Sequence, residues 1–577
     1  MMNRHIRNCI CVFLLAAAVS LLDGCSFRPK PEKTPEGETL FRLGFAGTPA
    51  SLNPYAACDP EAETAIALLY DTLFSEDLST GETVGSLCAE YTVTNSSSGV
   101  GKLWNITLRD DVYWSDGEKL TSLDVEFSLQ SLKDLSALYG YPFCELLDTT
   151  GIAVTDDTHL AMIVWGEEPA VKACLSHIPI LPRHIWNEPD YMSYDVSGIA
   201  ADPVRAAAQI GRVPADASVM IGSGPYTWGG YSDGVLTLRL NRAYRSGTSK
   251  AEVLELRYGL EDPAAALTEN RIDACADMSL NAFRALSENE AVRTAAGTDG
   301  VLYQLAFCFA SEKSPVRDSA VRRAAEYCTA RDALLLYAFG GGYRERGLIS
   351  PFSPWYSMDE SVFDRPYDID TASSLLRNAG WTDTDGDGIR EKNGVPLSLT
   401  LVYGNETPAW ERAARFLKTT FAAAGAEIRA VALPPEEFAG TLASGDWDLC
   451  LIARETRPEP WMSFGYYYWD GGDNSYAEPA RGGGVNSPGW NDSGYASAEF
   501  DRLYAELAAS SDPEEIRSLS AEAGEYLYND SAAVTIGFSV KYQACSRVWM
   551  GLRTASDGRY FSPGTIAEQM RSVTAGR

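Results

Sequence analysis

The sequence predicts an α/β protein that folds into at least two lobes, and two observations support this. The chain has 577 residues, of which 45% are hydrophobic, so it is too long for one core of ordinary size. Strand-like runs alternate along it with amphipathic stretches of helical period. The strand-like runs are residues 41–45, 236–240, 397–402 and 449–453, and the helical stretches are residues 372–378, 409–424 and 514–528. Such alternation is typical of layered α/β lobes, in which helices cover the faces of sheets.

The N-terminal segment is expected to be an export signal and not part of the fold. Arg4 and Arg7 precede an apolar stretch at residues 10–22, which is shorter than the ~20 residues that cross a membrane as a helix. No later stretch is long and apolar enough to cross a bilayer, so we expect the rest of the chain to lie outside the membrane.

The apolar stretch ends in a sequence that indicates lipid attachment. Residues 22–25, LDGC, resemble the lipobox of bacterial lipoproteins, although Asp23 departs from the small or apolar residue usual at that position. We therefore expect residues 1–25 to be a lipoprotein signal peptide with Cys25 as the lipidated residue. The polar, proline-rich residues 26–39 are expected to be a tether. An ordinary signal peptide cleaved nearby is the alternative.

Charge and cysteine usage exclude several classes of protein. The formal net charge is −31, and no run rich in lysine or arginine interrupts the acidity, so no nucleic-acid partner is expected. Of the 12 cysteines, three lie in the expected signal and anchor, and the other nine are scattered without a C-x-x-C pair, which argues against a zinc cluster or a thioredoxin-type site. We expect most of them to be small hydrophobic residues of the core.

The acidic segment after residue 101 is interpreted as a structural corner and not as a catalytic site. Trp104, Ile106 and Leu108 alternate with polar residues as in a half-buried strand, and residues 112–114 are expected to return as a short strand. Ser-Asp-Gly follows as a turn, and then Thr121 begins a helix with Asp124 completing a short capping box. Each acidic residue therefore has a local structural role.

The same segment carries a resemblance to a known family. Residues 107–129, TLRDDVYWSDGEKLTSLDVEFSL, resemble the signature of the family 5 extracellular solute-binding proteins, which are the oligopeptide- and dipeptide-binding receptors of ABC importers. Further segments similar to the family stand in the family's order along the chain. They are SLNPYAA, LLYDTLF, VTDDTHLAMIV, IPILPRHIW, IGSGPYTW, LNRAY, SPVRDSAVRRAAEYC, GWTDTDGDGIREKNGVPL and GDWDLCL.

The resemblance implies a fold and a function. The fold would be a two-lobed clamshell like the type II periplasmic-binding proteins, with an extra N-terminal subdomain. Lobe I would comprise residues 40–300 and 533–577, and lobe II residues 301–532, with two crossing segments as a hinge. The protein would be a monomer without enzymatic activity. It would capture a short peptide or related small solute by hinge closure and deliver it to the membrane subunits of an ABC permease.

The resemblance also places a ligand site after the strand at residues 449–453, and there the sequence departs from the family. Peptide-binding members have a segment similar to W-x-A-D-Y-x-[DE]-P, whose first Asp holds the amino terminus of the peptide. Residues 454–460 read RETRPEP, so Arg454 replaces the Trp, and Thr456 or Arg457 replaces the Asp. The amine anchor is then missing unless Glu455 replaces it, and the two arginines favour an acidic or N-blocked ligand. Alternatively, an offset of one or two residues leaves both arginines on the surface.

Further ligand-binding residues are implied by the resemblance alone, with ordinary packing as the alternative for each. They are Tyr55, Cys58, Asp59, Tyr139, Tyr141 and Phe438. The aromatic residues 466–469 either line a wall of the site or belong to the core.

Residues 383–391, DTDGDGIRE, leave two interpretations open. Asp383, Asp385 and Asp387 match the first, third and fifth positions of an EF-hand calcium loop. The twelfth position, where the bidentate Glu belongs, is Gly394. The missing ligand favours a tight loop before the next strand, so neither a metal nor another cofactor is expected.

Two other functions are weighed against solute binding. The sequence lacks the G-x-S-x-G, H-E-x-x-H and P-loop motifs, but an exported two-lobed hydrolase acting on peptides or carbohydrates remains the alternative. His159, His177 and His184 are scattered and support a nickel or haem receptor only weakly. A structural role is favoured for His184.

Overall fold

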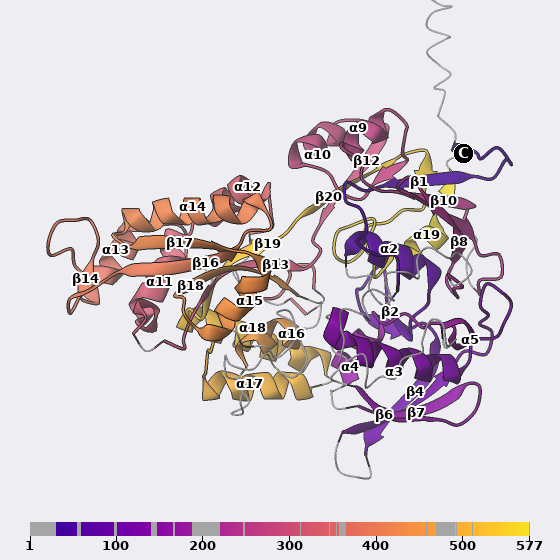
Figure 1. The fold of residues 1–577 in the computed structure, drawn as a ribbon, viewed down its shortest axis with the longest axis horizontal. Coiled ribbons are helices and arrows are strands. Elements are labelled where there is room, and N and C mark those ends of the chain that lie inside the picture. Colours follow the sequence, from indigo (N-terminus) through magenta and orange to yellow (C-terminus); the bar gives the residue numbers. More distant parts are fainter. Residues whose placement is uncertain are drawn as a thin grey trace, which may run out of the picture.

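The chain forms two lobes joined by two crossing segments (Figure 1). The computed structural model describes residues 31–54, 59–96, 101–139, 147–164, 168–186, 220–245, 249–311, 313–344, 347–353, 355–356, 365–456, 460–468, 491, 493–510 and 512–575. Within these residues no helix combines the length and the apolar character that crossing a membrane requires.

Lobe I is built on a seven-stranded mixed sheet with the order β12-β20-β11-β1-β10-β9-β8. Its strands are β1 (Leu40–Gly44), β8 (Tyr226–Ser232), β9 (Val235–Leu240), β10 (Val253–Arg257), β11 (Ala274–Cys275), β12 (Val292–Gly297) and β20 (Lys541–Ser546). The helices α2 (Pro60–Leu69), α9 (Pro263–Thr268), α10 (Leu280–Ser287) and α19 (Ile566–Ser572) and the short pair β21 (Trp549–Met550) and β22 (Thr574–Ala575) complete this part. β1 is fully buried and pairs in parallel with β10 and β11, so the core of the lobe forms around it.

A smaller subdomain belongs to the same lobe. Its antiparallel sheet has the order β4-β5-β7-β6, with β4 (Cys88–Asn95), β5 (Lys102–Leu108), β6 (Leu147–Val154) and β7 (His159–Val164). The hairpin β2 (Phe74–Glu76) and β3 (Thr83–Gly85) and the helices α3 (Ser122–Tyr139), α4 (Glu168–Leu175) and α5 (Arg183–Trp186) accompany it. One hydrophobic cluster runs through both parts of lobe I, from Phe41 to Trp104 and Ile106, so the subdomain is not an independent unit.

The predicted corner is confirmed, with one correction. The Asp124 carboxylate accepts hydrogen bonds from the backbone N–H groups of Thr121 (2.7 Å) and Arg183 (2.9 Å), and the side chain is buried. Residues 112–114 do not form the expected strand, because only Tyr113 pairs, in a single bridge with Lys119. Hydrogen bonds from the N–H of Trp114 to the carbonyl of Glu118 and from the N–H of Leu120 to the carbonyl of Val112 flank this bridge.

Part of the expected tether folds onto lobe I. Lys33 and Thr39 form a bridge, and Glu32 forms an ion pair with Arg42 at 2.6 Å. The tether assigned to residues 26–39 is therefore wrong over its second half, because the charge of Glu32 and the backbone of residues 32–40 are bound at the start of β1.

Lobe II is built on a five-stranded sheet with the order β17-β16-β18-β13-β19. Its strands are β13 (Val301–Phe307), β16 (Ser398–Gly404), β17 (Glu427–Leu433), β18 (Leu449–Glu455) and β19 (Ala533–Phe538), and a hairpin adds β14 (Glu391–Lys392) and β15 (Val395–Pro396). The helices are η4 (Pro315–Arg317), α11 (Ser319–Cys328), α12 (Arg331–Phe339), α13 (Ile369–Asn378), α14 (Pro408–Ala423), α15 (Pro435–Ser444), α16 (Pro460–Phe464), η5 (Gly465–Tyr467), α17 (Ala498–Ala509) and α18 (Pro513–Asp530). Leu305 and Phe307 pack on one face of the sheet and Leu302 and Ala306 on the other, so helices cover both faces.

The chain passes between the lobes twice. The first crossing joins β12 to β13 at residues 297–301, and the second joins β19 to β20 at residues 538–541. The expected boundary between residues 532 and 533 is wrong, because β19 pairs with β13 in the sheet of lobe II, with Phe538 opposite Leu302. The return to lobe I therefore follows Phe538 and does not precede β19.

Most predicted elements are confirmed. The four strand-like runs fall in β1, β9, β16 and β18, and the three helical stretches in α13, α14 and α18. The cysteines of the described part that are identified as free thiols are all buried, as core residues are expected to be. They are Cys88, Cys174, Cys275, Cys308, Cys328, Cys450 and Cys545.

Candidate ligand-binding cavity

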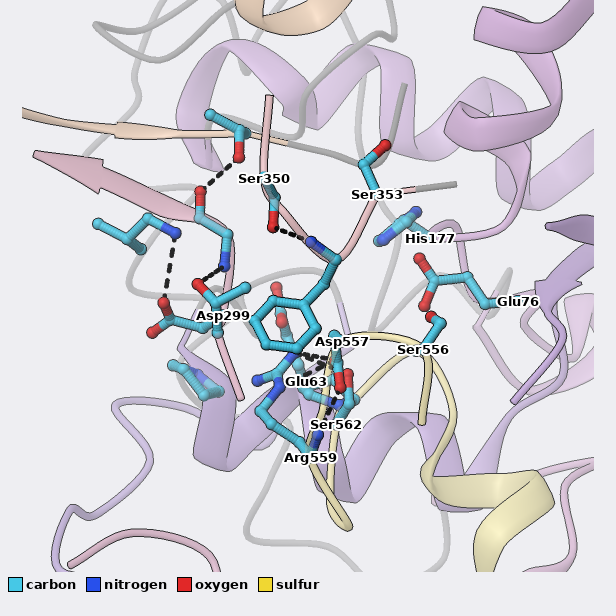
Figure 2. A pocket seen from close by; sticks show the side chains of 18 residues that line it. Glu63, Glu76, His177, Asp299, Ser350, Ser353, Ser556, Asp557, Arg559 and Ser562 are labelled. Carbon is cyan, nitrogen blue, oxygen red and sulfur yellow. Dashed lines mark hydrogen bonds and ion pairs between the residues drawn. The ribbon is translucent and has the colours of Figure 1, made fainter. Parts of the chain in front are cut away.

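A cavity of about 180 Å³ lies where the two lobes meet at the first crossing (Figure 2). Lobe I contributes the start of α2, the end of β2, the segment after α4 and a loop at residues 556–564. Lobe II contributes the start of β13, a loop at residues 350–353 and the residue after β18. The lining residues are Pro60, Glu63, Glu76, His177, Thr298, Asp299, Gly300, Val301, Ser350, Phe352, Ser353, Thr456, Ser556, Asp557, Arg559, Ser562, Pro563 and Gly564.

The loop at residues 556–564 is held rigidly against the first crossing. Gln543 of β20 is only 2% exposed, and its side-chain Oε1 accepts hydrogen bonds from the N–H groups of Tyr560 (2.8 Å) and Phe561 (2.9 Å). Gly558 has a φ of +84°, and a Cβ there would lie 2.7 Å from the carbonyl oxygen of Ala296. Only glycine satisfies both conditions, so glycine is required at position 558 for this loop to pack against the first crossing.

This loop presents an ordered arginine to the cavity. The Arg559 guanidinium donates to the Asp557 carboxylate from Nε at 2.9 Å and lies within 2.8 Å of it at Nη2. Nη2 also donates to the hydroxyl of Ser562 at 2.8 Å. The arginine is therefore fixed in direction, and its charge is matched by a neighbouring carboxylate.

Asp299 ties the two crossings together. Its carboxylate accepts a hydrogen bond from the hydroxyl of Ser539 in the second crossing, and Lys541 lies 3.4 Å away. Burial alone would raise the pKa of Asp299, but Lys541, Ser539 and Arg559 outweigh it and leave the pKa below its ordinary value. Asp299 is thus a charged group at the hinge and at the wall of the cavity.

Thr456 joins the end of β18 to the same crossing. Its N–H and its hydroxyl both donate to the carbonyl oxygen of Gly300, at 2.9 and 2.6 Å. Thr456 is one of the two positions at which the family's amine-binding Asp was sought, and it lines the cavity without a charge.

The lining carries an excess of negative charge. Glu63, Glu76, Asp299 and Asp557 are carboxylates, whereas Arg559 and, when protonated, His177 are the cations. In Figure 2 these groups approach the cavity from lobe I and from the first crossing. Such a wall is complementary to a ligand that carries a positive charge, and its donors and acceptors suit noncovalent binding.

Arg454, a predicted ligand residue, is not among the residues that line this cavity. Its side chain is 1% exposed, its Nε donates to Gln304 at 3.0 Å, and its guanidinium lies 4.4 Å from the ring of Tyr466. The reason is strand alternation, which places Arg454 on the same face of β18 as the buried Ile452. Tyr466 and Tyr467 are likewise core residues.

Two further predicted ligand residues have structural contacts. The Asp59 carboxylate accepts hydrogen bonds from the N–H groups of Ala62 and Ala50, each at 2.8 Å, and so caps α2. Phe438 in α15 packs against the cluster that contains Trp447. Neither residue lines the cavity, although Asp59 directly precedes Pro60, which does.

The remaining predictions for the site lie outside what the structure describes. Tyr55, Cys58, Tyr141, Arg457 and Cys25 belong to segments without a described placement. Tyr139 ends α3 and Glu455 ends β18, but their side chains are also outside the described part.

The segment at residues 383–391 brings four carboxylates within 4.8 Å of one another, at Asp383, Asp385, Asp387 and Glu391. All four already accept hydrogen bonds within the loop, and Asp385 accepts from the N–H of Asp387 at 3.1 Å. Asp383 accepts from the N–H groups of Gly386 (2.7 Å) and Gly388 (3.1 Å). Glu391 accepts from the N–H of Thr384 at 2.9 Å, and Asp387 from that of Ile389 at 2.8 Å. These bonds support the interpretation as a tight loop.

The three histidines occupy separate places. His184 binds Asp116 at 2.8 Å, which agrees with a structural role, and His159 binds Asp156 at 2.8 Å. Only His177 among the three lines the cavity, and its Nδ1 lies 2.9 Å from the carbonyl oxygen of Ala173. The histidines therefore do not form a cluster of metal ligands.

Sequence reasoning missed most of the cavity. Asp299, Asp557 and Arg559 stand in Asp-Gly segments that read as ordinary turns, and Glu63 and Glu76 carry no motif. Each of these residues stands in a local sequence pattern that predicts no partner. They lie close together only because β12 pairs with β20 and β13 pairs with β19.

Comparisons with known proteins agree with this architecture. A profile of the bacterial extracellular solute-binding proteins, family 5 (middle), matches residues 84–477. The chain is 25% identical over 366 residues to protein XP55 of Streptomyces lividans, a match that covers 63% of this chain and 60% of that protein, which is less than two thirds of its length. It is 22% identical over 456 residues to the oligopeptide-binding protein AppA of Bacillus subtilis, covering 76% of this chain and 77% of AppA.

Solved structures show the same fold. AppA of Bacillus subtilis, solved in complex with a nonapeptide, superposes with a TM-score of 0.67 at 18% identity, covering 95% of this chain and 100% of AppA. NikA of Brucella suis, solved in complex with Fe(III)-EDTA, superposes with a TM-score of 0.70 at 16% identity, covering 93% of this chain and 100% of NikA. The resemblance inferred from the sequence motifs and the two-lobed α/β fold are confirmed, and the chain belongs to the bacterial extracellular solute-binding proteins of family 5.

Proposed function

We propose that this protein captures a short peptide or a related small solute outside the cytoplasm and delivers it to the membrane subunits of an ABC permease. The observation that carries the proposal is the position of the cavity, which is lined by both lobes and by the first crossing segment. The relatives named as oligopeptide-binding proteins, and the AppA structure that holds a nonapeptide, support the peptide class.

Hinge closure is the proposed mechanism. A ligand that touches Glu63 or Arg559 in lobe I and Thr456 or Ser350 in lobe II stabilises the arrangement in which these walls are close. The ligand shifts the equilibrium between the open and closed arrangements only through contacts that form in the closed arrangement and are absent from the open one. Neither the cavity nor the comparisons favour the hydrolase alternative, and the proposed mechanism requires no chemical step.

The charge of the cavity favours a ligand with a cationic group. The earlier preference for an acidic or N-blocked ligand rested on Arg454 and Arg457, and Arg454 is buried within lobe II. The cavity itself presents four carboxylates and one arginine, and that arginine is bound to Asp557. An ammonium group, such as the amino terminus of a peptide or a lysine side chain, is the complementary partner.

A calorimetric titration with trilysine, trialanine and triglutamate tests the proposal. We expect affinity to fall in that order, and Glu63→Gln or Glu76→Gln to weaken trilysine by about tenfold, equivalent to ~1.4 kcal/mol. Glu90→Gln, which removes an exposed charge of β4, is the control. Binding of none of the three would contradict the peptide class, and a preference for triglutamate would contradict the cationic group.

Lipid attachment through Cys25 is the remaining part of the proposal, together with a location at the membrane surface and a monomeric state. Cys25→Ser should release the protein from the membrane fraction and leave peptide affinity unchanged. A variant that stays with the membrane would contradict this anchor.

A further inference from the structure

A second cavity, of about 610 Å³, lies between the lobes at the second crossing. Its walls include Glu261, Asp262 and Asp277 of lobe I, Tyr303 and Phe339 of lobe II, and Lys541 of the second crossing. The described residues that line it are all different from those that line the first cavity. Each crossing therefore borders a cavity of its own.

Lys541 connects the two crossings and the two cavities. It begins β20 and lies opposite Gly297, the last residue of β12, so its backbone is held beside the first crossing. Its amine lies 3.4 Å from the carboxylate of Asp299, which lines the first cavity, whereas Lys541 itself lines the second. A single ion pair thus reaches from one cavity to the other.

Asp277 is a second carboxylate for the same lysine. It follows β11 and lines the second cavity together with Lys541. Burial raises the pKa of Asp277, and Lys541 opposes this rise. Burial alone would lower the pKa of Lys541, but Asp299 and Asp277 outweigh it. Among the residues that the structure describes, Lys541 forms its ion pair with Asp299, and Asp277 forms none.

The other charged groups around Lys541 have fixed places. Arg559 is bound to Asp557 at 2.9 Å. Asp262 caps α9 through a hydrogen bond of 2.9 Å, and Glu261 is exposed. The Lys541 side chain is 33% exposed and borders the open space of the second cavity. A lysine carries its charge on a flexible stem, so this cation can turn from one carboxylate to the other.

We propose that Lys541 is a charge switch that couples the first cavity to the hinge, an inference that rests on the cationic ligand of the proposed function. Without ligand, Lys541 neutralises Asp299 and ties the second crossing to the first. A cationic group in the first cavity repels Lys541 and takes its place at Asp299, and Lys541 turns to Asp277. The tie between the crossings is then released, so ligand binding and movement of the hinge are linked.

The first test needs no ligand and follows chemical denaturation of the full chain. Asp299→Asn removes the charge that a bound cation would neutralise, so Lys541 should pair with Asp277 in this variant. Asp277→Asn should therefore lower the denaturation midpoint more in Asp299→Asn than in the wild type. This difference should disappear when Lys541→Met is added to both backgrounds. An equal shift with Asp299 and with Asn at that position would overturn the switch.

The second test is a calorimetric titration with trilysine. Lys541→Met leaves Asp299 to the ligand and should raise trilysine affinity about tenfold. Asp277→Asn should weaken trilysine about tenfold, because the displaced lysine loses its new partner, and should have no effect in Lys541→Met. Lys392→Met is the control, since Lys392 is 34% exposed and is paired with Asp318 in lobe II. It should leave trilysine affinity unchanged.

Two results of the titration would overturn the switch. One is an unchanged affinity in Lys541→Met, and the other is an equal loss from Asp277→Asn with and without Lys541. If trilysine does not bind the wild type, the cationic ligand of the proposed function fails. The denaturation test then decides alone whether Lys541 exchanges its partners.

Discussion

Two ion pairs of the molecule are built in different ways, one inside lobe I and one at the hinge. Inside lobe I, the two terminal nitrogens of Arg245 donate to the Asp71 carboxylate at 2.7 and 2.9 Å, and the arginine side chain is 8% exposed. At the hinge, Lys541 of the second crossing approaches Asp299 of the first at 3.4 Å. The difference indicates that the geometry of the pair inside lobe I is fixed by folding, whereas that of the hinge pair also depends on the angle between the lobes.

The largest expected effect is on the ion pair inside lobe I. Asp71→Ala should lower the free energy of unfolding by about 3–5 kcal/mol, because it leaves the Arg245 charge buried without its partner. Chemical denaturation measures this. Glu269→Ala, which breaks the exposed ion pair with Arg271, should change stability by about 0–1 kcal/mol. Equal effects of the two substitutions would show that the buried pair does not support the fold of lobe I.

The next effect concerns the loop that bounds the first cavity. Gly558→Ala should lower the free energy of unfolding by about 2–3 kcal/mol, because it combines a positive φ with overlap against Ala296. Gly386 has the same φ of +84° but no atom within 4 Å of the added Cβ, so Gly386→Ala should cost about 1 kcal/mol. The difference in unfolding free energy between the two variants measures the contact of Gly558 with Ala296 at the hinge. Equal losses of stability in the two variants would show that this contact does not hold the loop.

A smaller effect is expected at the hinge itself. Asp299→Asn should lower the free energy of unfolding by about 1.5 kcal/mol at neutral pH, because it removes a charged acceptor of Ser539 and a partner of Lys541. The folded state lowers the pKa of Asp299, so its stabilisation is present above the unfolded value of about 3.9 and is lost as the pH falls through the lower, folded value. The difference in stability between the two proteins should therefore begin to shrink as the pH falls below about 4 and should vanish only below the lowered folded pKa. A constant difference across that range would contradict an ionised Asp299.

The contrast between Arg454 and Asp124 shows the difference between a role set by local sequence and a position set by tertiary structure. Asp124 was recognised as structural because a capping box is a local pattern of four residues. Arg454 was expected in the site because the resemblance aligned it with a ligand-binding segment. Arg454 is buried because the alternation of side chains along β18 directs it into the interior of lobe II. There its guanidinium donates a hydrogen bond to Gln304 of the neighbouring strand β13.

The sequence by itself determined the α/β class, four of the strands and three of the helices, the corner within residues 108–129 and the family. These features depend on periodicity, caps and turns, which act over a few residues. Only the tertiary structure decided that β19 belongs to lobe II and that Asp299 meets Lys541. It also decided that Arg454 is buried within lobe II. The physical reason is that these contacts join elements far apart in the chain. They depend on the register of the sheets and on the packing of side chains, which no local sequence pattern encodes.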